Sequence, residues 1–331
     1  MDSSEGGAAA KAASGAQQRS RRGATLSVIV PMHNEEAVLG PLFERLDEVL
    51  PKDVAVEIVC VDDGSRDGTA AALAARAAVD PRLRVLLLAR NFGQEAALTA
   101  GLEAADGDML VLLDADLQDP PELIGEFIAL WEQGYDVVYG IRADRSRDGF
   151  FKRSTAGMFY RLFNALSDVP IPPDTGSFRL VDRKVVEALK DLPERTRFLR
   201  GLFTWVGFRQ VGVPYVRPER VAGATSYGLA RMWRLAVDGL TSFTTAPLRI
   251  WTAVGLALAG LALLYAGYTV LKVLIYGREA PGWASLMVVM LFGFAVQMIA
   301  FGVLGEYVGR LYQEVKGRPI YLVREKIGFD R

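Results

Sequence analysis

Carboxylate and amide side chains gather in the segment 114–122, which reads Asp-Ala-Asp-Leu-Gln-Asp-Pro-Pro-Glu. Asp114 and Asp116 are separated by one residue, so at the end of a strand both side chains can point the same way. With the amide of Gln118 they offer hard oxygen ligands for Mg2+ or Mn2+, and such an ion takes its other ligands from water and a diphosphate. The alternative is an acidic turn with a proline stop before the next helix.

The apolar run 109–113, directly before these acids, predicts a strand buried on both faces. Helical patterns alternate along the chain with further strands, which we expect at 26–30, 54–61, 84–88 and 136–141. This alternation predicts an α/β domain with a mostly parallel sheet and helices on both faces. Such sheets bind ligands at the carboxyl ends of their strands, where the acids lie.

A second acidic pair, Asp62 and Asp63, follows the predicted strand 54–61. A carboxylate in this position can hold ribose hydroxyls or a base edge. Adjacent acids repel one another unless something binds them, whereas Asp67 and Gly68 are explained by a helix-capping turn. The sequence has neither a Gly-x-Gly-x-x-Gly fingerprint nor a P-loop. We therefore expect the sheet to bind a nucleotide through carboxylates and a metal ion.

Composition excludes several other classes of protein. The 331 residues carry 38 Lys and Arg against 39 Asp and Glu, so no net positive field attracts nucleic acid. The single cysteine, Cys60, excludes an internal disulfide and a cysteine metal site, and its apolar neighbours predict a core position. The single histidine, His33, excludes a histidine-cluster metal centre; we expect a structural role, with a ligand contact as the alternative.

Two uncharged stretches near the C-terminus predict a transmembrane hairpin. Residues 250–271 and 280–305 number 22 and 26. Each is long enough to cross a hydrocarbon core of roughly 30 Å at about 1.5 Å per residue. Basic residues cluster at the outer ends of the hairpin and not in its joining loop, which places both termini in the cytoplasm. Gln297, within the second span, needs a helix contact, and contact between subunits would make a homo-oligomer.

The regions outside the sheet and the spans complete the predicted organisation. Residues 1–24 lack an apolar signal-peptide core and are expected to form a disordered tail. The apolar spacing of residues 229–243 favours a helix in the membrane interface, although packing against the sheet domain gives the same pattern. The expected domains are a tail at 1–24, the sheet domain at 25–220, a juxtamembrane segment at 221–248, the two transmembrane helices at 249–308 and a cytoplasmic C-terminal tail at 309–331.

Three blocks in this order, 31–36, 62–69 and 114–122, resemble the catalytic domain of the inverting family 2 glycosyltransferases, which has the GT-A fold. Residues 90–97 and the membrane hairpin narrow the resemblance to polyprenyl-phosphate glycosyltransferases, and residues 195–208 to their bactoprenol glucosyltransferase branch. The resemblance implies inverting transfer of glucose from UDP-glucose to a polyprenyl phosphate such as undecaprenyl phosphate. It also implies a multi-pass protein of the cell inner membrane.

The resemblance assigns roles to individual residues. Asp174 and Asp116 are the expected catalytic carboxylates, and the alternative for Asp174 is a turn after Pro172 and Pro173. The expected metal ligands are Asp114, Asp116 and Gln118. The residues expected at the nucleotide are Pro31, Asn34, Glu35, Asp62, Asp63, Arg90 and Asp114.

Basic side chains are needed on the acceptor side, because a lipid phosphate must approach a diphosphate against like-charge repulsion. The alternative for any single arginine in this region is an exposed side chain that contacts only water. Relatives commonly carry a lysine where this chain has Thr225-Ser226-Tyr227, so Arg220 or Arg217 has to supply that charge. The residues expected at the acceptor phosphate are Arg142, Arg153, Arg200 and Arg220.

Two rival functions remain open at this point. A processive polysaccharide synthase shares the catalytic domain, but such chains usually carry a Gln-x-x-Arg-Trp type stretch and more spans. A membrane scaffold that binds a nucleotide sugar without turnover would be expected to lack the carboxylates. Asp62, Asp114, Asp116 and Asp174 are all present.

Overall fold

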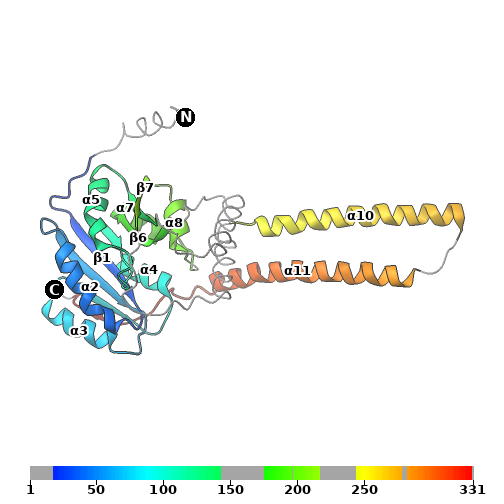
Figure 1. Cartoon of the computed structure of the whole chain (residues 1–331). Helices are drawn as coiled ribbons and strands as arrows, with labels where there is room; N and C mark the ends of the chain where they lie inside the picture. The colour runs from blue at the N-terminus through cyan, green and yellow to red at the C-terminus, as the bar shows by residue number, and fades with distance from the viewer. Residues whose placement is uncertain (1–17, 143–174, 196, 217–243, 278–281, 330–331) are drawn as a thin grey trace. The chain divides into compact units, whose positions relative to one another are not determined.

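The computed structural model describes residues 18–142, 175–195, 197–216, 244–277 and 282–329 (Figure 1). It divides into two units, a sheet domain that includes the C-terminal residues 319–329 and a helical unit that contains two long helices. The predicted helix at 154–166 and the predicted interface helix at 229–243 lie outside the described residues.

Eight strands form one sheet in the order β7-β5-β6-β4-β1-β2-β3-β8. Their bounds are β1 Thr25–Met32, β2 Ala55–Asp62, β3 Leu83–Leu88, β4 Met109–Leu112, β5 Val137–Arg142, β6 Thr175–Asp182, β7 Gln210–Tyr215 and β8 Val323–Ile327. The central strands β4, β1, β2 and β3 are mutually parallel, while β6 and β8 run against their neighbours. The predicted mostly parallel sheet is confirmed.

Helices cover both faces of this sheet. Their bounds are η2 Glu36–Val38, α2 Leu39–Val49, α3 Thr69–Val79, α4 Gln94–Ala104, η3 Pro121–Leu123, α5 Ile124–Glu132, α7 Arg183–Lys190 and α8 Leu199–Trp205. One face packs Val28 and Cys60 with apolar residues of α2, α3 and α5. On the other face α4 lies close to β1, because a Cβ atom at Gly101 would stand only 2.3 Å from Ile29 Cγ2. The predicted core position of Cys60 is confirmed, since it is 0% exposed.

The C-terminal segment, predicted as a tail, contains the edge strand β8. This strand pairs antiparallel with β3, and the N–H of Ala89 donates to the carbonyl of Leu322 at 2.8 Å. The Tyr321 hydroxyl donates to Glu103 at 2.6 Å. Residues 323–327 carry three consecutive charged side chains, as exposed edge strands often do, and this hides the strand from a hydrophobicity pattern.

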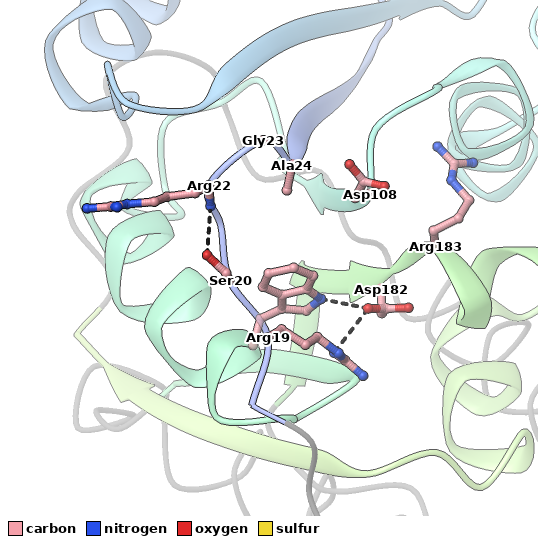
Figure 2. A pocket seen from close by; sticks show the side chains of 9 residues that line it. Arg19, Ser20, Arg22, Gly23, Ala24, Asp108, Asp182 and Arg183 are labelled. Carbon is pink, nitrogen blue, oxygen red and sulfur yellow. Dashed lines mark hydrogen bonds and ion pairs between the residues drawn. The ribbon is translucent and has the colours of Figure 1, made fainter.

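The tail predicted at 1–24 is wrong for residues 19–24, which pack against the sheet domain. Arg19 donates to the carbonyl of Tyr135 at 3.0 Å and pairs with Asp136 and with Asp182, the latter at 3.0 Å. Its guanidinium lies 5.2 Å from the centre of the Trp131 ring. Figure 2 shows Arg19 turned toward Asp182. Arg19 and Asp182 help line an open hollow of about 480 Å3. The hollow lies where β1 and β4 begin, at the edge opposite the predicted ligand site.

Two long helices, α10 (Ala246–Tyr276) and α11 (Trp283–Val315), form the second unit. Their segments Leu248–Lys272 and Leu286–Val315 have mean hydropathies of 1.9 and 2.3 and are long and apolar enough to cross a membrane. The prediction of two such helices is confirmed, with the second continuing beyond residue 305. The partner of Gln297, whose side chain is exposed on α11, stays a prediction.

The contacts of Arg19 yield a test of the N-terminal arm. Arg19→Ala leaves two largely buried carboxylates without one of their cations, so we expect a loss of about 1–3 kcal/mol in stability. Thermal unfolding of the purified protein in detergent measures it. Arg22→Ala is the matched control, because the Arg22 side chain is exposed. Equal melting temperatures for wild type and both variants would contradict a docked arm.

Candidate active site

The three loops that carry the predicted donor residues meet at one edge of the sheet. β1 and β2 end together, with Met32 opposite Asp62 in the parallel register. β4 runs beside β1, and the N–H of Leu113 donates to the carbonyl of Ile29 at 3.0 Å, one residue before Asp114. The sequence placed these acids at the carboxyl ends of strands, and the structure confirms that position for Asp62 and Asp114, on the two strands that flank β1.

Hydrogen bonds tie the loop after β1 to the loop after β2. Asn34 adopts a left-handed backbone with φ 58°, which asparagine tolerates better than most residues. Its side-chain oxygen accepts from the N–H of Arg66 at 2.8 Å, and its N–H donates to the Ser65 hydroxyl at 2.9 Å. The N–H of Glu35 donates to the Thr69 hydroxyl at 2.9 Å. Asn34 and Glu35 therefore hold the predicted nucleotide loops together, and their contact with a nucleotide stays a prediction.

The adjacent acids Asp62 and Asp63 are both buried, and backbone amides offset their repulsion. The carboxylate of Asp62 accepts from the N–H of Ser65 at 3.3 Å. The two oxygens of Asp63 accept from the N–H groups of Phe92 and Gly93 at 2.7 and 2.8 Å. Asp63 thereby shapes the loop between β3 and α4, which is a role that the sequence did not reveal.

Arg90 lies in that same loop and is exposed. Its guanidinium stacks 4.0 Å from the centre of the Phe92 ring. Gly64 allows this loop to approach, because a Cβ atom there would lie 2.4 Å from the carbonyl carbon of Arg90. The structure brings Arg90 to the same edge as Asp62, and Pro31 lies within β1 at its carboxyl end.

The predicted metal loop has an unusual backbone. Leu117 has φ 55°, a left-handed conformation that is costly for a branched residue and is found where the surroundings impose it. The turn lets the N–H of Gln118 donate to Asp116 Oδ1 at 3.2 Å. Asp114 accepts from the side-chain amide of Gln94 at 2.8 Å. Gln94 was not predicted from the sequence, because its contact with Asp114 joins residues 20 positions apart.

Three carboxylates crowd the end of β4. Burial raises the pKa of Asp114 to about 7, and the charges of Asp119 and Asp116 add to this rise. The cations Arg200 and Arg142 oppose it. Asp119 is fully buried, and its Oδ2 atom has no hydrogen-bond partner in the part of the chain that the structure describes.

This donor set fits a hard divalent cation. The described residues contain no group of three or more acidic, histidine or cysteine side chains arranged as a complete metal site. Mg2+ and Mn2+ are commonly held by one or two carboxylates, with water and substrate phosphates completing the shell. Asp114, Asp116 and the amide of Gln118 suit that pattern. The raised pKa of Asp114 reflects burial first and the charges of Asp119 and Asp116 second, and a bound cation would offset both.

Two predicted acceptor arginines lie at the same edge. Arg142 ends β5 and Arg200 lies in the first turn of α8, and both act electrostatically on Asp114. Gly176 leaves room for Arg142, because a Cβ atom there would stand 3.1 Å from Arg142 Nη2. The other predicted acceptor and catalytic residues, Asp174, Arg153 and Arg220, lie outside the described residues.

Two further charged residues near the site were not found from the sequence. Arg179 on β6 is buried, and burial lowers its pKa to about 9. It donates to the carbonyl of Gly176 at 2.9 Å and lies 4.5 Å from the centre of the Phe203 ring. Glu95 accepts from the N–H of Leu199 at 3.0 Å and so anchors the start of the helix that carries Arg200.

Comparison with known proteins identifies the family. The model for glycosyl transferase family 2 matches residues 27–190, and the model for the GtrB C-terminal hairpin matches residues 246–311. An uncharacterized glycosyltransferase of Synechocystis sp. is 48% identical over 306 residues, covering 92% of this chain and 96% of that protein. The SfII prophage-derived bactoprenol glucosyl transferase of Shigella flexneri is 45% identical over 301 residues, covering 91% and 97%.

A solved structure is also similar. Glucosyl-3-phosphoglycerate synthase from Mycobacterium tuberculosis, in complex with Mn2+, UDP-glucose and phosphoglyceric acid, gives a TM-score of 0.46 at 22% identity. The match covers 66% of this chain and 79% of that one. The membership rests on the curated relatives, which match almost end to end. This chain therefore belongs to the family 2 glycosyltransferases, in the branch that includes the bactoprenol glucosyl transferases.

Proposed function

We propose that the protein transfers glucose from UDP-glucose to the phosphate of a polyprenyl carrier such as undecaprenyl phosphate, with inversion at the anomeric carbon. One observation carries the proposal: the acidic loop 114–119 and the cations Arg142 and Arg200 share one edge of the sheet. This is the charge pattern that a reaction between a diphosphate and a phosphate requires. The names of the relatives at 44–45% identity, bactoprenol glucosyl transferases, support glucose and a lipid acceptor.

On the donor side, Asp114, Asp116 and Gln118 would hold the metal ion. When bound, a divalent ion there stabilises the negative charge that develops on the departing UDP. Gln94 fixes the orientation of Asp114 through its 2.8 Å hydrogen bond. Asp63 holds the loop that presents Arg90, so the protein positions the nucleotide with preformed loops.

On the acceptor side, the nucleophile needs little activation. A phosphate monoester has a second pKa near 6 and is mostly dianionic at pH 7. One of its oxygens attacks the anomeric carbon while the bond from that carbon to the UDP oxygen breaks on the opposite face, which inverts the configuration. Arg142, Arg153, Arg200 and Arg220 hold the acceptor phosphate against repulsion. Asp174 positions the acceptor or balances these arginines rather than removing a proton.

The hairpin keeps the catalytic domain next to its lipid substrate. Two membrane crossings return the chain to the side on which it started, and we propose that this side is the cytoplasm. The strand β8 supports the arrangement, because residues that follow the hairpin pair with β3 of the sheet that precedes it. The active site would then face cytoplasmic nucleotide sugars beside the inner membrane.

The rival functions have less support. The described residues contain two helices long enough to span a membrane, whereas processive synthases usually have more. A silent scaffold would not need three crowded carboxylates, one of them fully buried, because such a set costs stability unless a ligand uses it.

A panel of labelled nucleotide sugars tests the function directly. We expect purified protein in detergent, given Mn2+ and undecaprenyl phosphate, to transfer label from UDP-glucose into the extracted lipid. Labelled UDP-galactose and GDP-mannose are tested as alternative donors in separate, parallel reactions. Label in a polymer would favour the synthase, and binding of UDP-glucose without any labelled product would favour the scaffold.

The metal loop yields the next prediction. Asp116→Ala removes a predicted ligand, so we expect initial rates of lipid labelling to fall by more than about 100-fold, beyond the usual loss for a residue that only supports a ligand. Asp53→Ala is the control, since Asp53 is exposed and pairs with Arg21. Full wild-type activity in excess chelator, or equal activity of the two variants, would refute metal-dependent transfer.

The basic side chains yield a prediction that separates the two substrates. Arg200→Ala should raise the KM for undecaprenyl phosphate about tenfold, because a hydrogen bond to a charged group contributes about 1.5–3 kcal/mol. The KM for the nucleotide sugar should change much less, and Arg153→Ala should behave alike. Arg209→Ala is the control, since Arg209 stacks on Tyr135 just before β5 begins. A larger effect on the nucleotide sugar would assign Arg200 to the donor instead.

A further inference from the structure

Three side chains from different elements form a connected chain beneath the active site. Arg142 and Tyr215 stand opposite one another in the parallel strands β5 and β7. The Tyr215 hydroxyl donates to Asp119 Oδ1 at 2.5 Å, and Arg142 Nε donates to the Tyr215 oxygen at 3.4 Å. We refer to these residues as the Arg142–Tyr215–Asp119 chain. It connects the end of the metal loop with a predicted acceptor arginine.

The ring of Tyr215 is held firmly in place. Tyr215 is 5% exposed, and a Cβ atom at Gly140 would lie only 2.7 Å from its Cε1 atom. Phe178 meets the ring edge to face, with centroids 6.2 Å apart and an interplanar angle of 83°. Because the ring cannot shift in this packing, the hydroxyl stays directed at Asp119.

Asp119 is a fully buried carboxylate at the end of the metal loop. It is 0% exposed, and its Oδ2 atom lacks a hydrogen-bond partner within the described residues. A buried carboxylate with an unsatisfied oxygen costs free energy unless a nearby cation offsets it. Arg142 is the cation on which Asp119 acts, both directly through its charge and through Tyr215.

The tyrosine between the two charges has a consequence for Arg142. A direct arginine–carboxylate pair commonly uses two N–H groups of the guanidinium. Here the Tyr215 hydroxyl takes only the Nε–H group. The Nη2 atom lies close to Gly176, because a Cβ atom on that glycine would be 3.1 Å away. Gly176 follows Asp174 by two residues in the sequence. The Nη edge of the guanidinium, which suits a phosphate, is thus not used by Tyr215.

We propose that Tyr215 and Asp119 are positioning residues for the acceptor phosphate, fixing the Arg142 guanidinium so that its Nη edge binds that phosphate. The inference rests on the proposed function, since it assumes a phosphate monoester as the acceptor. It adds two residues that neither touch the donor nor take part in bond making. The oxygen of Tyr215 contacts Asp119 and Arg142, so its effect is expected on acceptor binding rather than on binding of the nucleotide sugar.

Tyr215→Phe is the sharpest test, because it removes one oxygen atom and keeps the packed ring. We expect the KM for undecaprenyl phosphate to rise about tenfold, which corresponds to about 1.4 kcal/mol. The KM for the nucleotide sugar should stay within about twofold, as expected for two sites that do not share this contact. Tyr135→Phe is the matched control, because its ring stacks with Arg209 just before β5 begins. An unchanged lipid-phosphate KM, or an equal rise in both KM values, would overturn the proposal.

Two further variants approach the chain from its ends. Asp119→Asn keeps an acceptor for the Tyr215 hydroxyl but removes the charge, so the lipid-phosphate KM should again rise, together with a change at the metal loop because Asp119 also acts on Asp114. Gly176→Ala places a methyl group 3.1 Å from Arg142 Nη2 and displaces the guanidinium from the other side. If Tyr215→Phe fails to fold, Gly176→Ala decides the matter, and an unchanged lipid-phosphate KM in that variant would overturn the proposal.

A binding measurement separates this inference from the proposed function. Farnesyl phosphate is titrated into the full-length protein loaded with UDP and Mn2+, and its Kd is compared between wild type and Tyr215→Phe. A selective loss of binding in Tyr215→Phe supports the inference even if the wild type transfers no sugar, which would refute the proposed function alone. Equal Kd values, or no binding to the wild type, would overturn the inference even if sugar transfer is observed.

Discussion

Repulsion among carboxylates at the end of β4 is the constraint on which the rest of the site depends. Asp114, Asp116 and Asp119 lie within one short loop, and burial together with mutual repulsion raises the pKa of Asp114 to about 7. A fold accepts such an arrangement only where a cation or a ligand offsets the charge. The crowded loop therefore marks the place where a divalent ion and a diphosphate are expected.

The neighbouring elements manage this charge in different ways. Backbone amides of Phe92 and Gly93 bind Asp63, so the acids after β2 do not add to the repulsion. Arginines supply the positive charge: Arg142 and Arg200 both act on Asp114. Tyr215 accepts from Arg142 and donates to Asp119, and in the proposal above this contact orients the guanidinium toward the acceptor phosphate. The acidic loop after β4 and the end of β5 are thus connected through a few buried contacts.

The sequence was most informative where a buried strand runs directly into acids. β1, β2 and β4 were predictable from their apolar runs. The helices between them predict that the strands are parallel, so Asp62 and Asp114 could be placed at the same edge of the sheet. Gln94 and Asp119 could not be assigned, because their roles arise from contacts with Asp114 and Tyr215 that are distant in sequence. β8 was missed because its charged residues conceal the strand, and Arg19 because a single arginine carries no pattern.

The most direct test of the account is the affinity of UDP for the full-length protein in detergent, measured by calorimetry with Mn2+ and again with excess chelator. If the crowded carboxylates bind a divalent ion that bridges to the diphosphate, Mn2+ should tighten UDP binding by about tenfold or more, within the usual range of coupling between two ligands. Equal UDP affinities in Mn2+ and in chelator would contradict the conclusion that these carboxylates bind a divalent ion together with the diphosphate.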